Sequence, residues 1–259
     1  MRLINNILKL KTNDCHIVLL SDWHIGNESC NFQLINKLVS YVKKTPNAYA
    51  IILGDLIEMI GYHSKGLLHS QKIYATEQFK EAVRILEPIK DKILFAVTGN
   101  HEGRTVKDCA LDLMELLCER LDIDYRGVDC YFGIKNLSGT LIRWYTTHGS
   151  AGGATIGAKV NRLEKCHWKF PNADILVMGH THSLSDIYKE IPFLTQTGKV
   201  ESKIQYFVCA GTALGSDAKY AAQAGYPPAP VGGKIIHIKK GAATKATDNV
   251  VINIETILV

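Results

Sequence analysis

The 259-residue chain lacks several features that define whole classes of protein. Its apolar runs, such as 17–20 and 49–53, are short, and none approaches the roughly 18 apolar residues that a membrane-spanning helix needs. It contains no block of five or more like charges, so we predict no basic arm and no acidic tail. Residues 1–14 contain neither a sustained apolar segment nor a small-residue cleavage site, so we expect no signal peptide and a cytoplasmic location.

The seven cysteines are irregularly spaced, and the sequence contains no Cys-x-x-Cys pair. This argues against a zinc ribbon and against a thioredoxin-type redox site. Several cysteines lie in apolar stretches, such as Cys209 in the run 206–210. We therefore predict free thiols that pack in the core of a protein from a reducing compartment.

The composition is that of an ordinary globular protein, with 46% hydrophobic and 21% charged residues. This argues against a disordered chain, a collagen-like chain and a coiled coil. The formal net charge of +5 supports nucleic-acid binding only weakly.

Short apolar runs alternate with segments of helical periodicity over the first two-thirds of the chain. Strands are predicted at 16–20, 49–53, 93–97 and 173–178, with a β-hairpin of 131–134 and 140–146 around the turn 136–139. Helices are predicted at 31–44, 71–89, 106–121 and 158–169. Four more strands, without long helices between them, are predicted at 187–191, 204–209, 234–239 and 250–257. The pattern indicates an α/β protein that becomes mostly β toward its end, and we predict a single domain, 1–259.

Polar residues of an unusual kind directly follow four of the predicted strands. The segments are Ser-Asp-Trp-His-Ile-Gly at 21–26, Gly-Asp-Leu-Ile-Glu at 54–58, Gly-Asn-His-Glu at 99–102 and Gly-His-Thr-His at 179–182. A fifth, Thr-His-Gly at 147–149, follows the hairpin. Because ligands bind at the carboxyl ends of strands in open α/β sheets, we expect these segments to converge on one rim.

Such a convergence would unite oxygen and imidazole ligands without a thiolate. The set is Asp22, His24, Asp55, Asn100, His148, His180 and His182. It suits manganese, iron, zinc or nickel, and it is large enough for two ions about 3.5–4 Å apart with one bridging carboxylate. Each segment alone is a weak signal, because a lone His-x-His pair is commonly only the polar end of a strand. The five signals together, each directly after an apolar strand, make coincidence improbable.

The five segments resemble the signature motifs of the calcineurin-like metallophosphoesterases, and the match spans residues 21–182. One small departure is Glu58, which stands where many members have aspartate. The resemblance implies an α/β fold, a four-layer α/β/β/α sandwich with two central mixed sheets. It also implies two divalent metal ions, with manganese favoured and iron, zinc or nickel as alternatives.

The resemblance also implies roles for individual residues. One ion would be held by Asp22, His24, Asp55 and His182, and the other by Asp55, Asn100, His148 and His180. Asp55 would bridge them, and His101 would contact the phosphate and protonate the leaving oxygen. These roles agree with the chemistry, because a hydroxide between two cations is a nucleophile near neutral pH. A histidine near its ordinary pKa of about 6.5 can then supply a proton.

The substrate is less clearly indicated. The Asp-x-His-apolar-Gly start resembles the DNA-repair exonuclease branch and the UDP-diacylglucosamine pyrophosphatase branch, and the compact chain also resembles small phage and prophage members. Three residues are candidates for substrate binding: Arg104, Arg162 and Tyr226. Arg104 is equally explained by a structural ion pair, and Arg162 by a solvated helix face. Tyr226 lies in 215–233, which is either a lid over the site or a surface loop.

We therefore expect a dinuclear metal-dependent hydrolase that cleaves a phosphodiester by direct attack of a metal-bridging hydroxide. Its substrate would be DNA, RNA or a nucleotide. With DNA or RNA as substrate, the enzyme would be a nuclease. One alternative is a phosphomonoesterase or pyrophosphatase acting on a small nucleotide-like substrate. An alternative of another class is a catalytically idle scaffold that keeps the fold for binding or regulation. The sequence does not indicate an oligomeric state.

Overall fold

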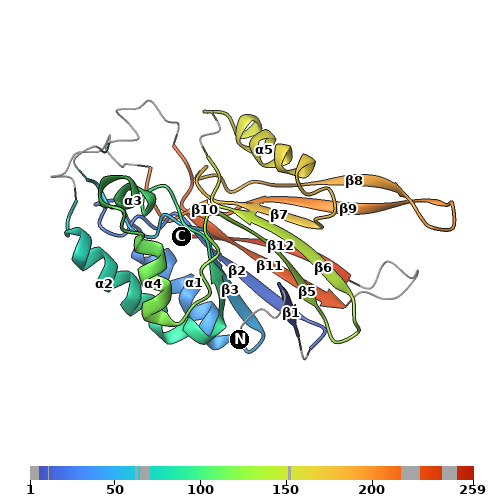
Figure 1. The fold of residues 1–259 in the computed structure, drawn as a ribbon, viewed down its shortest axis with the longest axis horizontal. Coiled ribbons are helices and arrows are strands. Elements are labelled where there is room, and N and C mark those ends of the chain that lie inside the picture. Colours follow the sequence, from blue (N-terminus) through green and yellow to red (C-terminus); the bar gives the residue numbers. More distant parts are fainter. Residues whose placement is uncertain are drawn as a thin grey trace.

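Two six-stranded sheets form the centre of the computed structural model, which describes residues 6–10, 12–61, 64, 71–150, 153–216, 228–240 and 250–259 (Figure 1). The first sheet has the order β1-β5-β6-β7-β9-β8, and the second has the order β10-β11-β2-β3-β4 with β12 paired to β11. The first contains β1 (Ile7–Lys9), β5 (Asp129–Lys135), β6 (Leu141–Thr147), β7 (Ile175–Met178), β8 (Asp186–Leu194) and β9 (Val200–Cys209). The second contains β2 (Cys15–Leu20), β3 (Ala48–Ile52), β4 (Ile93–Ala96), β10 (Gly211–Thr212), β11 (Gly232–Lys240) and β12 (Val250–Leu258).

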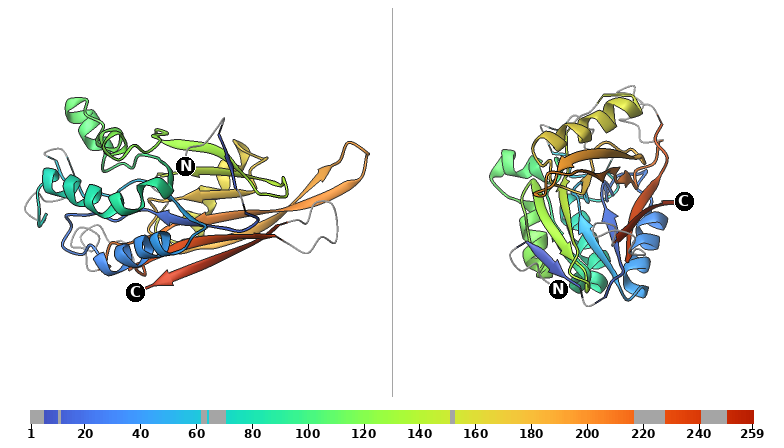
Figure 2. Two further views of the ribbon diagram at one scale, coloured as in Figure 1. Left: turned by 90° about the horizontal axis from the view of Figure 1, so that it is seen from below. Right: turned by 90° about the vertical axis from the view of Figure 1, so that its right-hand side faces the viewer.

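Helices cover the outer faces of both sheets and complete a four-layer α/β/β/α sandwich (Figures 1 and 2). The helices α1 (Phe32–Lys44), α2 (Ala75–Leu86) and α4 (Leu113–Leu121) share a hydrophobic cluster with β2, β3 and β4. On the other side, α5 (Ile156–Glu164) packs on β7 and β9. Between the sheets lies a third cluster, which includes Ile17, Phe95 and Trp144. The fold class predicted from the sequence is confirmed.

The predicted helix 31–44 forms because its first turn is capped and one of its faces is apolar. The side chain of Asn31 accepts a hydrogen bond from the backbone N–H of Leu34 at 2.9 Å, which satisfies one of the unpaired N–H groups at a helix start. The buried residues of α1 include all four apolar positions at the predicted helical spacing: Ile35, Leu38, Val39 and Val42.

The prediction of one helix over 106–121 was wrong. The structure has α3 (Gly103–Cys109) followed by α4, with Ala110 in the left-handed region at φ 57°. The side chain of Asp112 then caps a new helix by accepting the N–H groups of Met114 and Glu115. Two other predicted helices end as 3-10 helices: 71–89 becomes α2 and η2 (Glu87–Lys92), and 158–169 becomes α5 and η3 (Lys165–Trp168).

The parallel strands bring several carboxyl ends to one rim. In the second sheet β2, β3 and β4 are parallel, and in the first sheet β6, β7 and β9 are parallel. The loops that follow β2, β3, β4, β6 and β7 carry the five polar segments identified in the sequence. The fold therefore gathers residues that are up to 160 positions apart in the chain, from Asp22 to His182.

The cysteines behave largely as packing residues. All seven are free thiols, and four of them are buried: Cys15, Cys118, Cys130 and Cys209. Burial raises the pKa of Cys15, Cys118 and Cys130 to about 12, so these thiols stay protonated and unreactive near neutral pH. Among the described residues, no helix combines the length and the apolar character needed to cross a membrane.

A histidine cluster at the start of β2 predicts a pH dependence of stability. His16 packs against His237 of β11 and Tyr41 of α1. Burial, His237 and Lys239 lower the pKa of His16 below its ordinary value, and they outweigh Asp14 and Glu255. The unfolded chain therefore binds more protons than the folded one between the two pKa values, so the free energy of unfolding falls as the pH falls through this window.

We expect His16→Gln to reduce this pH dependence. Urea unfolding between about pH 7.5 and pH 5.5 should show a smaller loss of unfolding free energy in the variant than in the native chain, because the residue that gains a proton on unfolding is gone. Equal losses in both proteins would show that His16 does not carry the effect.

Candidate metal centre

Backbone hydrogen bonds join the loops that follow β2 and β3. The N–H groups of Asp22 and His24 donate to the carbonyls of Gly54 and Asp55, each at 3.1 Å. The buried carboxylate of Glu102 accepts the N–H groups of Asp55 at 2.9 Å and Leu56 at 2.7 Å. The loop after β4 is thereby tied to the same assembly.

Five of the predicted ligands have a left-handed backbone conformation, which non-glycine residues adopt only at a cost. They are Asp22, His24, Asp55, His180 and His182, with φ between 49° and 58°. Such a conformation costs on the order of 1–3 kcal/mol per residue and persists only where the surrounding structure enforces it. Its concentration here marks these loops as a functional site. The sequence carries no signal of it, since none of the five is a glycine.

Glycine is required at Gly99 and Gly179 for a different reason. Neither has a positive φ, but a Cβ on Gly99 would overlap Oδ1 and the backbone nitrogen of Asp55. A Cβ on Gly179 would overlap the hydroxyl of Ser21 and lie 3.0 Å from Oδ2 of Asp22. The two glycines allow the loops to approach the two carboxylates closely.

We expect Gly99→Ala to displace the carboxylate of Asp55. The added methyl group should destabilise the protein by about 1–3 kcal/mol, as overpacking does, and should weaken metal binding. Metal titration and thermal unfolding check both effects. Gly103→Ala is the matched control, because a Cβ there meets nothing within 4 Å. Metal affinity in Gly99→Ala equal to that of the control would contradict the prediction.

Among the described residues, three groups of side chains present atoms that could hold a metal ion, and two of these groups consist of predicted ligands only. The remaining group combines His24 with Glu58 and His101, which are not predicted ligands. In the first of the two groups of predicted ligands, Nε2 of His182 lies 3.2 Å from Oδ1 of Asp22 and 3.2 Å from Nε2 of His24. The second combines Asp55, His148 and His180. There, Nε2 of His148 lies 3.2 Å from Oδ2 of Asp55 and 3.0 Å from Oδ1 of Asn100. All seven predicted ligands therefore lie at the rim, with Asp55 in the second group.

Hydrogen bonds orient the imidazoles toward these groups. Nδ1 of His24 lies 3.0 Å from the carboxylate of Glu58, and Nδ1 of His148 lies 2.6 Å from the carbonyl of Leu53. With an oxygen acceptor at each Nδ1, that atom keeps a proton, and Nε2 faces the centre, where a cation that displaces its proton would find the lone pair. Glu58 makes the contact that orients His24.

The donor set fits divalent cations. Oδ1 of Asp22 is buried and makes no hydrogen bond of good geometry among the described residues, although Nε2 of His182 lies 3.2 Å away and buried polar atoms are normally hydrogen-bonded. The other converging atoms are carboxylate or amide oxygens and imidazole nitrogens, which bind divalent transition metals. The residues present therefore fit the metal ions that the motifs imply.

The electrostatics of the site favour positive charge. Burial alone would raise the pKa of Asp55, but the neighbouring His101 and His148 outweigh it and hold that pKa well below its usual value. Burial alone would lower the pKa of His148, but Asp55 and Asp22 raise it to about 10. Ionised carboxylates thus draw positive charge to the rim.

The proton donor was expected to be a histidine with a pKa near the ordinary value of about 6.5. For His101 this expectation was wrong. Burial lowers the pKa of His101 to about 4, because the residue is only 7% exposed. Its Nδ1 lies 2.6 Å from the carbonyl of Glu58, and a guanidinium N–H of Arg104 donates to its Nε2 at 2.8 Å. The same guanidinium donates to the carbonyls of Glu58 and Met59, so Arg104 supports the loop as well as His101.

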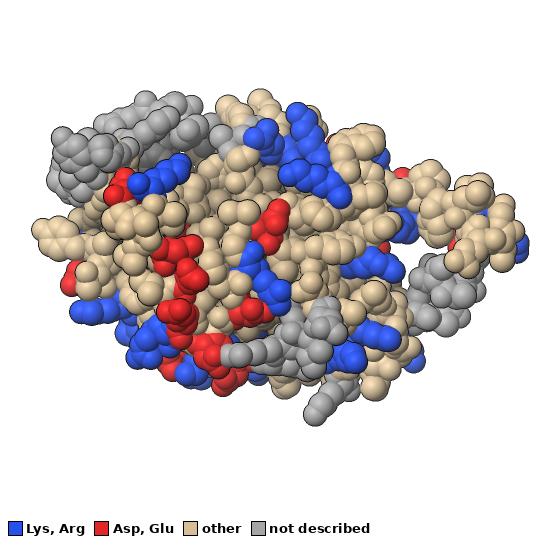
Figure 3. Space-filling view, viewed as in Figure 1, with Lys and Arg blue, Asp and Glu red and all other residues tan. Residues whose placement is uncertain are grey.

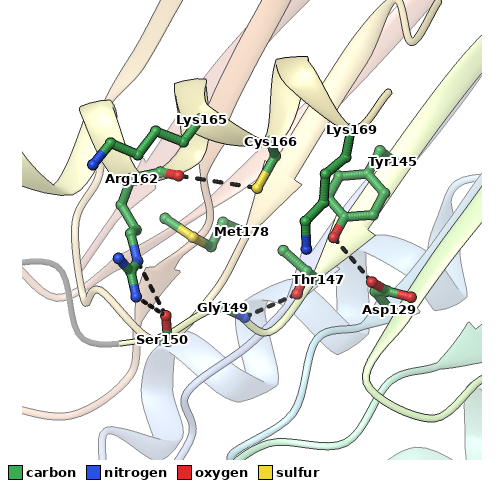
Figure 4. Close-up of a pocket in the computed structure, with 10 residues that line it drawn as sticks. All are labelled: Asp129, Tyr145, Thr147, Gly149, Ser150, Arg162, Lys165, Cys166, Lys169 and Met178. Carbon is green, nitrogen blue, oxygen red and sulfur yellow. Dashed lines mark hydrogen bonds between the residues drawn. The ribbon is translucent and has the colours of Figure 1, made fainter. Parts of the chain in front are cut away.

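Of the other two predicted substrate residues, the structure describes Arg162. Arg162 of α5 lines a cavity beside the rim and donates to the hydroxyl of Ser150 (Figure 4). Tyr226 and most of the predicted lid 215–233 lie outside the described residues. Sequence reasoning missed Glu102 as an organiser of the loops. The only signal for it was its place in the Gly-Asn-His-Glu segment.

Comparisons with known proteins establish the family. The family model described as calcineurin-like phosphoesterase matches residues 15–184, and the chain belongs to this family. Members bind divalent metals, and the described His and Asp groups could hold them. A search of the curated proteins finds no match.

Several solved structures are similar to this chain. A conserved uncharacterized protein from Streptococcus pneumoniae TIGR4, titled a predicted phosphoesterase, shares 13% identity over 95% of this chain and 90% of that chain, with a TM-score of 0.42. Vps29 from Chaetomium thermophilum shares 12% identity over 94% of this chain and 97% of that chain, with a TM-score of 0.39.

Proposed function

We propose that the chain is a dinuclear metal-dependent phosphodiesterase. The observation that carries this proposal is the pair of ligand groups, Asp22-His24-His182 and Asp55-His148-His180, on one rim. The first ion would be held by the first group together with Asp55, and the second ion by the second group together with Asn100. Asp55 would contact both ions. When bound, two such ions activate water as a nucleophile and offset the charge of the phosphoryl oxygens.

The chain's own residues would prepare the site for this chemistry. Glu58 and the carbonyl of Leu53 fix the imidazole rings of His24 and His148, so that these ligands need no reorganisation when substrate arrives. Glu102 holds the backbone of Asp55 in its strained conformation. The centre is therefore preorganised by residues that do not themselves touch the substrate.

His101 would act at the leaving-group oxygen through Nε2. To do so, Nε2 must exchange the hydrogen bond from Arg104 for one to the substrate. An anionic phosphoryl group beside the ring favours the protonated imidazole. Arg104 would then donate an N–H group to a phosphoryl oxygen. It would thus serve both as a structural residue and as a phosphate contact.

The substrate class can be tested with the metal-loaded protein. After loading with Mn²⁺, we compare bis-p-nitrophenyl phosphate with p-nitrophenyl phosphate, and then single- and double-stranded DNA and RNA. We expect cleavage of the diester in preference to the monoester. A preference for the monoester would support the phosphomonoesterase alternative. Inactivity with manganese, iron, zinc and nickel would support the idle scaffold. DNA or RNA as partner and a cytoplasmic location stay predictions, as does the single domain 1–259.

A further inference from the structure

A cavity of about 300 Å³ is lined in part by residues of the loops that carry His148 and His180. Thr147 and Gly149, which line it, are the neighbours of His148 in the chain, and Met178 precedes the Gly-His segment that contains His180 (Figure 4). A Cβ on Gly149 would lie only 2.5 Å from Cγ of Met178, so the two loops are in close contact here. A group in this cavity would therefore contact the loops that carry two residues of the second ligand group.

The cavity is lined by more positive than negative charge. Arg162 and Lys165 come from α5 and η3, and Lys169 follows η3 directly. Asp129 is the acidic residue among the described lining, and its carboxylate accepts a hydrogen bond from the hydroxyl of Tyr145 at 3.0 Å. Three cations against one carboxylate leave a net charge of about +2. Figure 3 shows Lys and Arg side chains gathered over α5 on the same face.

Hydrogen bonds tie the cavity wall to the loop that carries His148. The guanidinium of Arg162 donates to the hydroxyl of Ser150 through Nε at 3.1 Å and through a terminal nitrogen at 2.6 Å. The N–H of Gly149 donates to the hydroxyl of Thr147 at 3.1 Å. Lys165 and Lys169 are exposed, so their ammonium groups can reach an incoming anion. Arg162 is thus held by the loop, while the two lysines remain adaptable.

We propose that this cavity binds a second phosphate group of the substrate, adjacent to the phosphate that is cleaved. This inference rests on the proposed function. It assigns the substrate to molecules with at least two phosphate groups, either an oligonucleotide or an ester of a nucleoside diphosphate. The volume of the cavity is at the lower limit of ligand pockets. The cavity can therefore hold one phosphate with part of its sugar, but not a longer segment of polymer.

The test compares substrates that differ by a single phosphate. The dinucleotide TpT has one phosphate, and pTpT and TpTp each carry a second one at the 5′ or 3′ end. With the Mn²⁺-loaded native protein, we expect KM for one of the longer pair to be about tenfold below KM for TpT, with similar kcat, because hydrogen bonds to charged groups add binding energy. Lys165→Gln/Lys169→Gln should remove most of this preference.

The matched control is Lys43→Gln/Lys44→Gln, which changes the net charge equally at two exposed lysines in the last turn of α1. This control should keep the native preference. Competitive inhibition by thymidine 5′-diphosphate and by thymidine 5′-phosphate distinguishes the two substrate classes. A stronger effect of the diphosphate that depends on Lys165 and Lys169 assigns the cavity to nucleoside diphosphates, and a preference confined to the dinucleotides assigns it to oligonucleotides.

The outcomes separate this inference from the proposed function. A native protein that hydrolyses TpT but shows no preference for an added phosphate overturns the second phosphate site alone. So does a preference that persists in the Lys165/Lys169 variant. If neither TpT nor bis-p-nitrophenyl phosphate is hydrolysed with any metal, the proposed function fails. The second phosphate site is then tested by measuring the dissociation constants of TpT, pTpT and TpTp. If the dissociation constants of pTpT and TpTp are the same in the native protein and in the Lys165/Lys169 variant, the second phosphate site is overturned too.

Discussion

Replacing Asp55 by asparagine is expected to abolish most of the activity and to lower the metal content. Asp55 is 1% exposed and belongs to the second ligand group, and its Oδ1 accepts the N–H of His101 at 2.8 Å. Asparagine keeps that acceptor and the size of the side chain but removes the negative charge. Loss of an outer contact to a metal ligand alone costs about 10–100-fold, so loss of the charge shared by both ions should cost more.

Metal analysis and turnover of bis-p-nitrophenyl phosphate by the same preparation check this prediction. The matched control is Asp14→Asn, an exposed aspartate before β2. It should retain native metal content and activity. A fully active Asp55→Asn protein with native metal content would remove Asp55 from the centre and with it the bridging role.

Replacing His101 by alanine is expected to lower activity while the metal content stays native. His101 is not part of the seven-residue ligand set, and its Nε2 lies 3.9 Å from Oδ2 of Asp55. A proton donor positioned at the leaving group typically contributes about 10²–10⁴-fold. Atomic emission for the bound metal and kcat for TpT measure the two parts of this prediction.

The choice of leaving group separates proton donation from support of the loop. p-Nitrophenolate leaves readily as an anion, whereas a nucleoside alkoxide needs a proton as its bond breaks. His101→Ala should therefore lose much more activity on TpT than on bis-p-nitrophenyl phosphate. An equal loss on both substrates would assign His101 to positioning, through its contacts with Glu58 and Arg104.

Much of the fold is predictable from the sequence because local patterns and tertiary packing agree. The apolar runs at 16–20 and 49–53 become the central strands β2 and β3, which are buried on both faces. The break at Ala110 is not predictable, because apolar spacing continues across it and a left-handed alanine leaves no pattern. The short strands β1 and β10 were also missed, since pairing with distant partners defines them.

The candidate site was predictable in its membership but not in its geometry. Asp22, Asp55 and His180 lie just after strands, and parallel pairing within each sheet together with the packing of the two sheets brings their loops together. The strained backbone and the contact between Arg104 and His101 depend on how the loops pack against one another. These features arise only when the chain has folded, and they account for the unexpected pKa of His101.

The central claim is that one rim holds two metal ions with Asp55 between them. A crystal of the Mn²⁺-loaded protein, measured at the manganese absorption edge, tests it most directly. We predict two anomalous peaks, one against Asp22, His24 and His182 and the other against Asn100, His148 and His180, with the carboxylate of Asp55 touching both. A single peak, or peaks away from these side chains, would contradict the account.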